Sequence, residues 1–319
     1  MRDTAGWYRS FGEIEARGES AVYEEWALGV AADGQLIALI DELSLQKRQP
    51  NLIFACSRLL GAPEGPYPGF RDWLLHNWPA VAAETEHRST QTNEARRCAT
   101  LLPALAMIPG PLALLEVGAS AGLTLYPDRY SYRYDGGEPL HPSTGPSTVL
   151  LECTTNGRVP VPAELPTIVW RAGIDLEPLD VNDPRDAVWL ETLVWPEQHE
   201  RRERLRAAIA IARGHPPRLV RGDAIEALAA LASEAPTDAT LVVVASAVLV
   251  YLPAAERMRF VETVRALGVD WVSLEGVGGL PTVHAAIPEN GTPPGRFVLA
   301  LNERPLAWTG PHGQTLDWF

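Results

Sequence analysis

The stretch LLEVGASAGL, from Leu114 to Leu123, decides the fold of this chain. It continues an apolar run that predicts a buried strand over 112–117, with the acidic Glu116 close to its end. The small residues after this strand allow a tight turn and let a ligand approach the backbone closely. We therefore expect a strand, a loop and the start of a helix here, with a nucleotide-like ligand lying across the strand end.

Beyond this loop, short apolar segments alternate with helical segments, which is typical of a parallel sheet. The predicted strands are 112–117, 167–171, 218–221, 241–245, 271–275, 296–301 and 314–318. The predicted helices are 186–194, 198–213, 224–233 and 254–267. Residues 126–166 form an insertion that suggests a β-hairpin or meander, and 276–295 is rich in glycine and proline and predicts a loop.

The first 110 residues place apolar side chains three and four positions apart and predict helices, with no strand-like alternation. The pattern changes at Pro109-Gly110-Pro111. We expect an all-α cap over 1–110 that covers the substrate. We expect a Rossmann-like α/β domain over 111–319, whose seven-stranded, mostly parallel sheet ends in an antiparallel C-terminal hairpin.

The net charge of −13 argues against a nucleic-acid surface or an anionic membrane as partner, because both favour basic patches. The three cysteines are far apart and lack the paired spacing of a disulfide framework or a zinc site. The N-terminus lacks the apolar core of a signal peptide, and the apolar run 241–252 is too short to span a bilayer. We expect a cytoplasmic protein that binds a small molecule and no metal.

The loop pattern E-x-G-x-S-x-G resembles motif I of class I methyltransferases, with a serine in place of the middle glycine. The resemblance implies S-adenosylmethionine as cofactor. It also implies that the cofactor lies against the loop residues, which are Glu116, Gly118, Ala119, Ser120 and Gly122.

The same resemblance implies functional side chains after later strands. Asp175 would accept the hydroxyl protons of the ribose, although it could equally be a turn or cap residue. Asp223 would bind the adenine amino group beside the amide of Ala224, and it could also cap the helix that starts there. The stretch LVVVASAVLVYLP at 241–253 resembles the fourth-strand exit of small-molecule methyltransferases. Three of its residues would flank the cofactor, namely Ser246, Leu249 and the candidate catalytic residue Tyr251.

Two polar clusters could bind the substrate. In TQTNEARR at 90–97, the candidates for a polar substrate or the cofactor's amino-acid tail are Gln91, Asn93, Glu94 and Arg97. In WPEQHE at 195–200, Trp195 could hold a cation against its ring, and Glu197 or His199 could act as a base. The structural alternatives are a capped helix start for the first cluster and a helix junction at Pro196 for the second.

The five residues GASAG also fit G-x-S-x-G, the nucleophile elbow of α/β-hydrolases, which would make Ser120 a nucleophile. Asp223 and either His284 or His312 could then complete a triad. Three features argue against this interpretation. Pro127 follows too soon for a long helix, no HGGG-like segment precedes the turn, and Glu116 has no role in a hydrolase.

Nearly the whole chain resembles an uncharacterised bacterial family known as domain of unknown function 2332. The residues that carry this resemblance are TQTNE at 90–94, LLEVGASAGL at 114–123, DRY at 128–130, VWPEQH at 194–199, RGDA at 221–224 and PLAWTGPHG at 305–313. It implies a methyltransferase-like fold. We expect a methyltransferase that uses S-adenosylmethionine on a small molecule. A serine hydrolase, or a protein that binds S-adenosylmethionine as a sensor or for another reaction, stays open.

Overall fold

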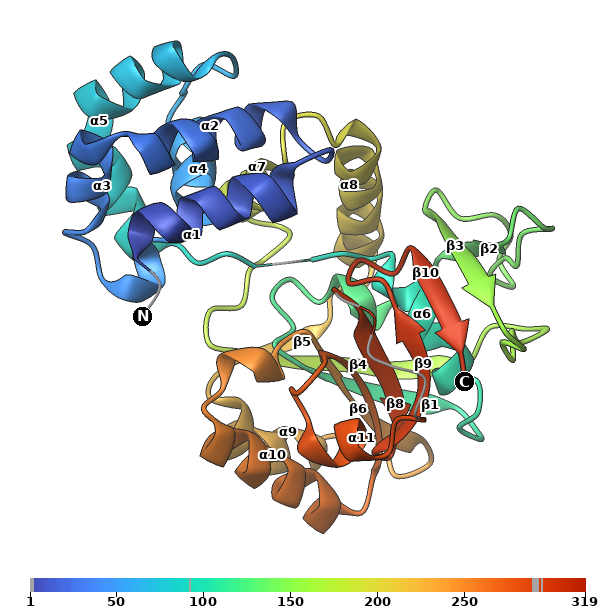
Figure 1. The fold of residues 1–319 in the computed structure, drawn as a ribbon. Helices are drawn as coiled ribbons and strands as arrows, with labels where there is room; N and C mark the ends of the chain where they lie inside the picture. The colour runs from blue at the N-terminus through green and yellow to red at the C-terminus, as the bar shows by residue number, and fades with distance from the viewer. Residues whose placement is uncertain (1–2, 92, 289–292, 294) are drawn as a thin grey trace. The chain divides into compact units, whose positions relative to one another are not determined.

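The computed structural model describes residues 3–91, 93–288, 293 and 295–319, which divide into two compact units (Figure 1). The first unit combines Met1–Thr92 with Pro184–Glu203, and the second combines Asn93–Asp183 with Arg204–Phe319. The division therefore differs from a single boundary at 110. Residues 93–110 belong with the sheet because helix α6 in this segment packs against strands β3, β7 and β8.

The described part of the first unit is helical throughout its regular structure. Its helices are α1 (Thr4–Ser10), α2 (Ala21–Ala32), α3 (Gly34–Ile40), α4 (Pro50–Leu59), α5 (Tyr67–His87), α7 (Pro184–Leu193) and the short η1 (Phe11–Ala16) and η2 (Leu45–Lys47). An aromatic core joins them, in which the rings of Trp26 and Phe70 stack with centroids 3.7 Å apart. Segment 184–203 returns to this unit because α7 packs against α4.

The described residues of the second unit form a ten-stranded sheet in the order β2-β3-β10-β9-β8-β7-β6-β1-β4-β5. Its strands are β1 (Leu112–Val117), β2 (Ser131–Tyr134), β3 (Leu150–Asn156), β4 (Ile168–Asp175), β5 (Arg218–Arg221), β6 (Thr240–Ser246), β7 (Asp270–Gly276), β8 (Phe297–Leu301), β9 (Arg304–Thr309) and β10 (Thr315–Trp318). Its helical segments are α6 (Arg97–Leu105), η3 (Leu123–Leu125), α9 (Ala224–Ala232), η4 (Leu249–Tyr251), α10 (Ala254–Leu267) and α11 (Pro281–Ala285), and α8 (His199–Gly214) runs across the unit boundary.

The five strands β5-β4-β1-β6-β7 are parallel to one another. From β1 the chain winds outward through β4 to β5, and then it crosses back to β6 and continues to β7. The winding direction therefore reverses between β1 and β6. In an open α/β sheet, a crevice forms at such a reversal, outside the carboxyl ends of the strands, and ligands bind there.

The structure corrects several expectations. The sheet has ten strands rather than seven, and the predicted hairpin in 126–166 is instead a parallel pair, β2 and β3, that extends the sheet beside β10. Helix α11 lies within the predicted loop 276–295, of which 289–292 and 294 fall outside the described residues. Among the described residues, the glycine loop is not followed directly by an α-helix. Gly122 is left-handed there, and Pro127 disfavours helical backbone at Tyr126, so only the 3₁₀ turn η3 forms.

The two faces of β1 carry different chemistry. Leu115 and Val117 join an apolar core with Phe260 and other residues of α9 and α10, which lie together beside the sheet (Figure 1). Side chains alternate along a strand, so Glu116 points to the opposite face. In the part of the chain that the structure describes, no helix is long and apolar enough to cross a membrane.

A substitution at Gly173 of β4 can test how closely the glycine loop packs on the sheet. A Cβ atom at Gly173 would lie 2.4 Å from the Cβ of Ala119 and 2.9 Å from Cδ2 of Leu219. We expect Gly173→Ala to lower the free energy of unfolding by about 1–3 kcal/mol, because the buried loop must shift. Urea unfolding midpoints check this result. Gly214→Ala, at a position with open space around it, is the matched control, and equal midpoints for both variants would contradict the packing.

Candidate functional site

The glycine loop after β1 carries three left-handed residues at alternate positions. Gly118, Ser120 and Gly122 have φ angles of 70°, 50° and 70°. The amides of Gly118 and Ala119 donate to the carbonyl oxygen of Ile174 at 2.8 and 3.1 Å, which holds the loop against the end of β4. Left-handed backbone is strained for a serine, so surrounding contacts must fix it.

Two side chains from distant segments supply those contacts. The amide of Ser120 donates to Oδ2 of Asp175 at 2.8 Å, and the amide of Ala121 donates to Oδ1 of Asn93 at 3.0 Å. The amide group of Asn93 also donates to the hydroxyl of Ser120. The structure thus brings three predicted site residues together, and it occupies two of the loop's N–H groups.

Asp223 lies at the next strand end. Its Oδ1 accepts hydrogen bonds from the amides of Ile225 and Glu226, at 2.8 and 3.2 Å, which confirms the predicted cap of the helix that starts at Ala224. The amide of Gly222 donates to the carbonyl oxygen of Asp175 at 2.9 Å, so the two aspartates stand at neighbouring strand ends. Oδ2 of Asp223 accepts no hydrogen bond from the described residues.

Glu116 is buried on the opposite face of β1 from the apolar core. The hydroxyl of Thr124 donates to its Oε1, whereas its Oε2 accepts no hydrogen bond within the described chain. Burial raises the pKa of Glu116 to about 8, although the Thr124 hydrogen bond and the charge of Arg97 oppose this shift. At neutral pH the carboxyl group is therefore mainly protonated.

The NEARR part of the first polar cluster belongs to this unit. Nη1 of Arg97 donates to the carbonyl oxygen of Ser246 at 3.1 Å, and its Nε donates to that of Pro311 at 3.0 Å. Glu94 accepts a hydrogen bond from Nε of Arg204 at 3.2 Å. The segment therefore ties the end of β6 to the loop before β10. Thr92, also part of the cluster, lies outside the described residues.

The turn after β6 holds the remaining predicted cofactor residues. The Ser246 hydroxyl is buried and makes no hydrogen bond to the described residues, and Leu249 is buried in the core. Tyr251 is 73% exposed on η4. The carboxyl group of Glu275 accepts hydrogen bonds from the amides of this turn, a role that the sequence analysis missed. A signal existed, because SLEG at 273–276 repeats the acid-after-leucine pattern of LLEVG.

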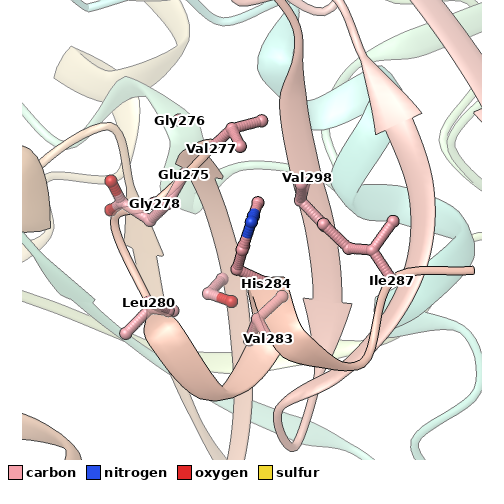
Figure 2. A pocket seen from close by; sticks show the side chains of 10 residues that line it. Glu275, Gly276, Val277, Gly278, Leu280, Val283, His284, Ile287 and Val298 are labelled. Carbon is pink, nitrogen blue, oxygen red and sulfur yellow. The ribbon is translucent and has the colours of Figure 1, made fainter. Parts of the chain in front are cut away.

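A small pocket lies at the end of β7, between β8 and α11 (Figure 2). Ser273, Glu275 and Val298 line it from the strands, and Figure 2 shows the side chain of His284 pointing into it. Its volume is about 10 Å³, which is about enough for one water molecule. A nucleoside does not fit into this pocket.

The second polar cluster belongs to the helical unit, as does Gln91. The carboxylate of Glu197 accepts hydrogen bonds from the Ser20 hydroxyl at 2.5 Å and from the Val22 amide at 2.9 Å, and so it fixes the start of α2. The ring of Trp195 packs among the aromatic core, with its centroid 5.6 Å from those of Phe11 and Tyr23. His199 is exposed at the first position of α8. The contacts of Trp195 and Glu197 match the predicted structural alternative, a junction between helices.

The chain is a mixed α/β protein whose described residues form a ten-stranded, mostly parallel sheet, with acidic side chains at the carboxyl ends of three of its parallel strands. The chain belongs to the bacterial family described as "Uncharacterized protein conserved in bacteria (DUF2332)", whose sequence profile matches residues 5–318. No match was found among curated proteins or among solved structures.

The raised pKa of Glu116 makes the free energy of unfolding depend on pH, and this dependence can be measured. Its pKa of about 8 in the folded state exceeds the value of about 4.3 for an unfolded chain. The protonated group therefore favours folding at low pH, and this advantage is lost as the pH rises through 8. A glutamine at this position would keep a neutral side chain of the same shape. We expect Glu116→Gln to be increasingly more stable than wild type between pH 5 and 8, by up to a few kcal/mol at about 1.4 kcal/mol per pKa unit.

Thermal unfolding midpoints across pH 5–9 measure the difference between wild type and Glu116→Gln. Glu152→Gln, at a side chain that is 62% exposed, is the control and is expected to follow wild type. A pH-independent difference for Glu116→Gln would mean that the carboxyl group is not perturbed by burial.

Proposed function

We propose that this protein is a methyltransferase that transfers the methyl group of S-adenosylmethionine to a small molecule. The observation that carries the proposal is the set of acidic residues at the carboxyl ends of three neighbouring parallel strands, Glu116 on β1, Asp175 on β4 and Asp223 after β5. They surround a left-handed glycine loop beside the point where the winding of the sheet reverses. We take β5-β4-β1-β6-β7 as the Rossmann-like part of a methyltransferase sheet.

The hydrogen bonds of the loop favour a ligand without phosphate. A phosphate or pyrophosphate binds at a helix N-terminus through free backbone amides. Here the amides of Ser120 and Ala121 already donate to Asp175 and Asn93, and a 3₁₀ turn replaces the helix. Carboxyl groups at this edge would also repel phosphate. S-adenosylmethionine has no phosphate and carries positive charge, so it suits these residues better than a dinucleotide does.

The residues present can supply the contacts that this cofactor needs. Each oxygen of Asp175 accepts one amide hydrogen bond and keeps a lone pair for a ribose hydroxyl. Oδ2 of Asp223 would accept from the adenine amino group, and Oε2 of the Glu116 carboxyl group, which is mainly protonated at neutral pH, would offer a further buried hydrogen bond. When bound, the cofactor supplies an electrophilic methyl group on its sulfonium.

The protein's own part in such a transfer is mainly to position the reactants, because in-line displacement depends on alignment. A base is needed only where the acceptor must lose a proton. Of the three candidate catalytic residues, Tyr251 stands on the turn that borders the glycine loop. Glu197 is less suited. Partial burial raises its pKa, but the hydrogen bonds from Ser20 and Val22 outweigh this and leave the pKa below its usual range. His199 stays a candidate.

Calorimetric titration with S-adenosylmethionine and S-adenosylhomocysteine tests the proposal. We expect micromolar binding by wild type and binding at least about tenfold weaker by Asp175→Asn, since a lost charged hydrogen bond costs about 1.5–3 kcal/mol. Asp72→Asn, whose side chain is 79% exposed in the helical unit, is the control. A folded wild-type protein that binds neither ligand would refute the function. Binding without any methylated product in an acceptor screen would indicate a sensor.

The serine hydrolase is the second candidate, because the φ of Ser120 is 50° and a nucleophile elbow also holds its serine on a strained turn. Its hydroxyl, however, accepts a hydrogen bond from the side-chain amide of Asn93, which cannot act as a base. A serine without a base is a weak nucleophile. We therefore expect a fluorophosphonate probe to leave Ser120 unlabelled, as judged by mass spectrometry against Ser120→Ala. Labelling of the wild type alone would establish the hydrolase.

A further inference from the structure

A buried carboxyl group at the end of β7 accepts two hydrogen bonds from the turn after β6, residues 246–252. The amides of Val248 and Leu249 donate to Oε1 of Glu275 at 3.0 and 3.1 Å. The residue before them, Ala247, is left-handed with a φ of 55°, and its amide donates to the carbonyl oxygen of Leu274 at 2.9 Å. The end of β7 thus determines how the chain leaves β6.

This turn forms a wall beside the glycine loop. A Cβ atom at Gly118 would lie 2.3 Å from Cγ2 of Val248, so the two segments are in direct contact. On the other side, Arg97 donates to the carbonyl oxygen of Ser246. Any shift of Val248 therefore changes the space next to the loop to which the ligand is assigned.

The surroundings of Glu275 are almost entirely apolar or backbone. Its side chain is buried, its Oε2 accepts no hydrogen bond from the described residues, and it lines the pocket of Figure 2. The charged or titratable groups around it include Arg97 of α6, whose charge acts on its carboxyl group, and His284 of α11, which lines the same pocket. Arg257 of α10 donates to the carbonyl oxygens of Gly278 and Gly279, two residues next to that pocket.

We propose that Glu275 is a positioning residue whose ionised carboxylate holds the turn after β6 against the glycine loop, so that ligand affinity follows its charge. The identity of the ligand rests on the proposed function, whereas the hold on the turn does not. A carboxylate accepts amide hydrogen bonds about twice as strongly as a neutral carbonyl does. Protonation therefore weakens both bonds at once.

The carboxyl group of Glu275 changes its charge at a pH near neutral. Burial raises the pKa of Glu275 to about 7, against the opposing effect of the Leu249 and Val248 hydrogen bonds and of Arg97. The ionised fraction rises from about one tenth at pH 6 to about nine tenths at pH 8. The turn is held firmly at pH 8 and loosely at pH 6, so affinity should increase with pH.

The first test is calorimetric titration with S-adenosylhomocysteine at pH 6, 7 and 8. For wild type we expect binding about tenfold weaker at pH 6 than at pH 8, in line with the ionised fraction. Glu275→Gln, which keeps the shape but not the charge, should bind at pH 8 about as weakly as wild type does at pH 6. Glu152→Gln and His284→Asn are controls that should keep the wild-type profile. Val248→Ala should weaken binding and keep the pH dependence.

The second test needs no ligand. Hydrogen exchange of the Val248 and Leu249 amides, corrected for intrinsic rates, should be faster in Glu275→Gln than in wild type at pH 8 and equal at pH 6. If wild type binds no S-adenosylhomocysteine, the proposed function fails, and this exchange measurement alone decides the role of Glu275. Exchange at wild-type rates in Glu275→Gln at pH 8 would overturn the proposal, as would a wild-type pH profile of binding in that variant.

Discussion

Two backbone amides, those of Ser120 and Ala121, determine the shape of the carboxyl edge. Their hydrogen bonds to Asp175 and Asn93 join three segments that are far apart in the sequence, namely the loop after β1, the end of β4 and the segment before α6. A buried amide left without a partner costs about 1–3 kcal/mol, so these bonds keep a non-glycine residue left-handed without help from a ligand. The edge is therefore preorganised by the protein's own side chains.

The parallel centre of the sheet was predictable because its signals are local. Apolar runs mark β1, β6 and β7, and α10 begins and ends where the sequence predicted. Strand pairing is not local. Thr154 of β3 pairs with Thr315 of β10, and no pattern near either residue identifies so distant a parallel partner. The strand-and-loop motif predicted a helix after Leu123, but the described residues form none there. The left-handed backbone of Gly122 and the effect of Pro127 on the residue before it both prevent a helix at this point.

The sequence predicted the positions of candidate site residues that lie at the ends of strands, because the ends of parallel strands meet at one edge of the sheet. Glu116, Asp175 and Asp223 each stand at or just after the end of a strand, so the sheet places them at one edge. The cluster around Glu197 shows the opposite case, because spacing alone does not tell whether a polar side chain binds a ligand or the backbone of a neighbouring helix. Glu275 was missed because its role depends on the turn after a different strand, which comes earlier in the chain.

Burial and a carboxyl oxygen left unused by the described residues distinguish Glu116 and Glu275 from acids that hold other parts of the fold in place. Both oxygens of Asp128 accept from Arg171 at 2.5 Å, and both oxygens of Glu197 hold the start of α2. Asp128 and Glu197 therefore hold other parts of the fold in place. Glu116 and Glu275 are more deeply buried, yet each leaves one oxygen without a hydrogen bond to the described residues, and burial raises both pKa values. Such an arrangement destabilises the folded chain at neutral pH, and acids of this kind concentrate at functional sites.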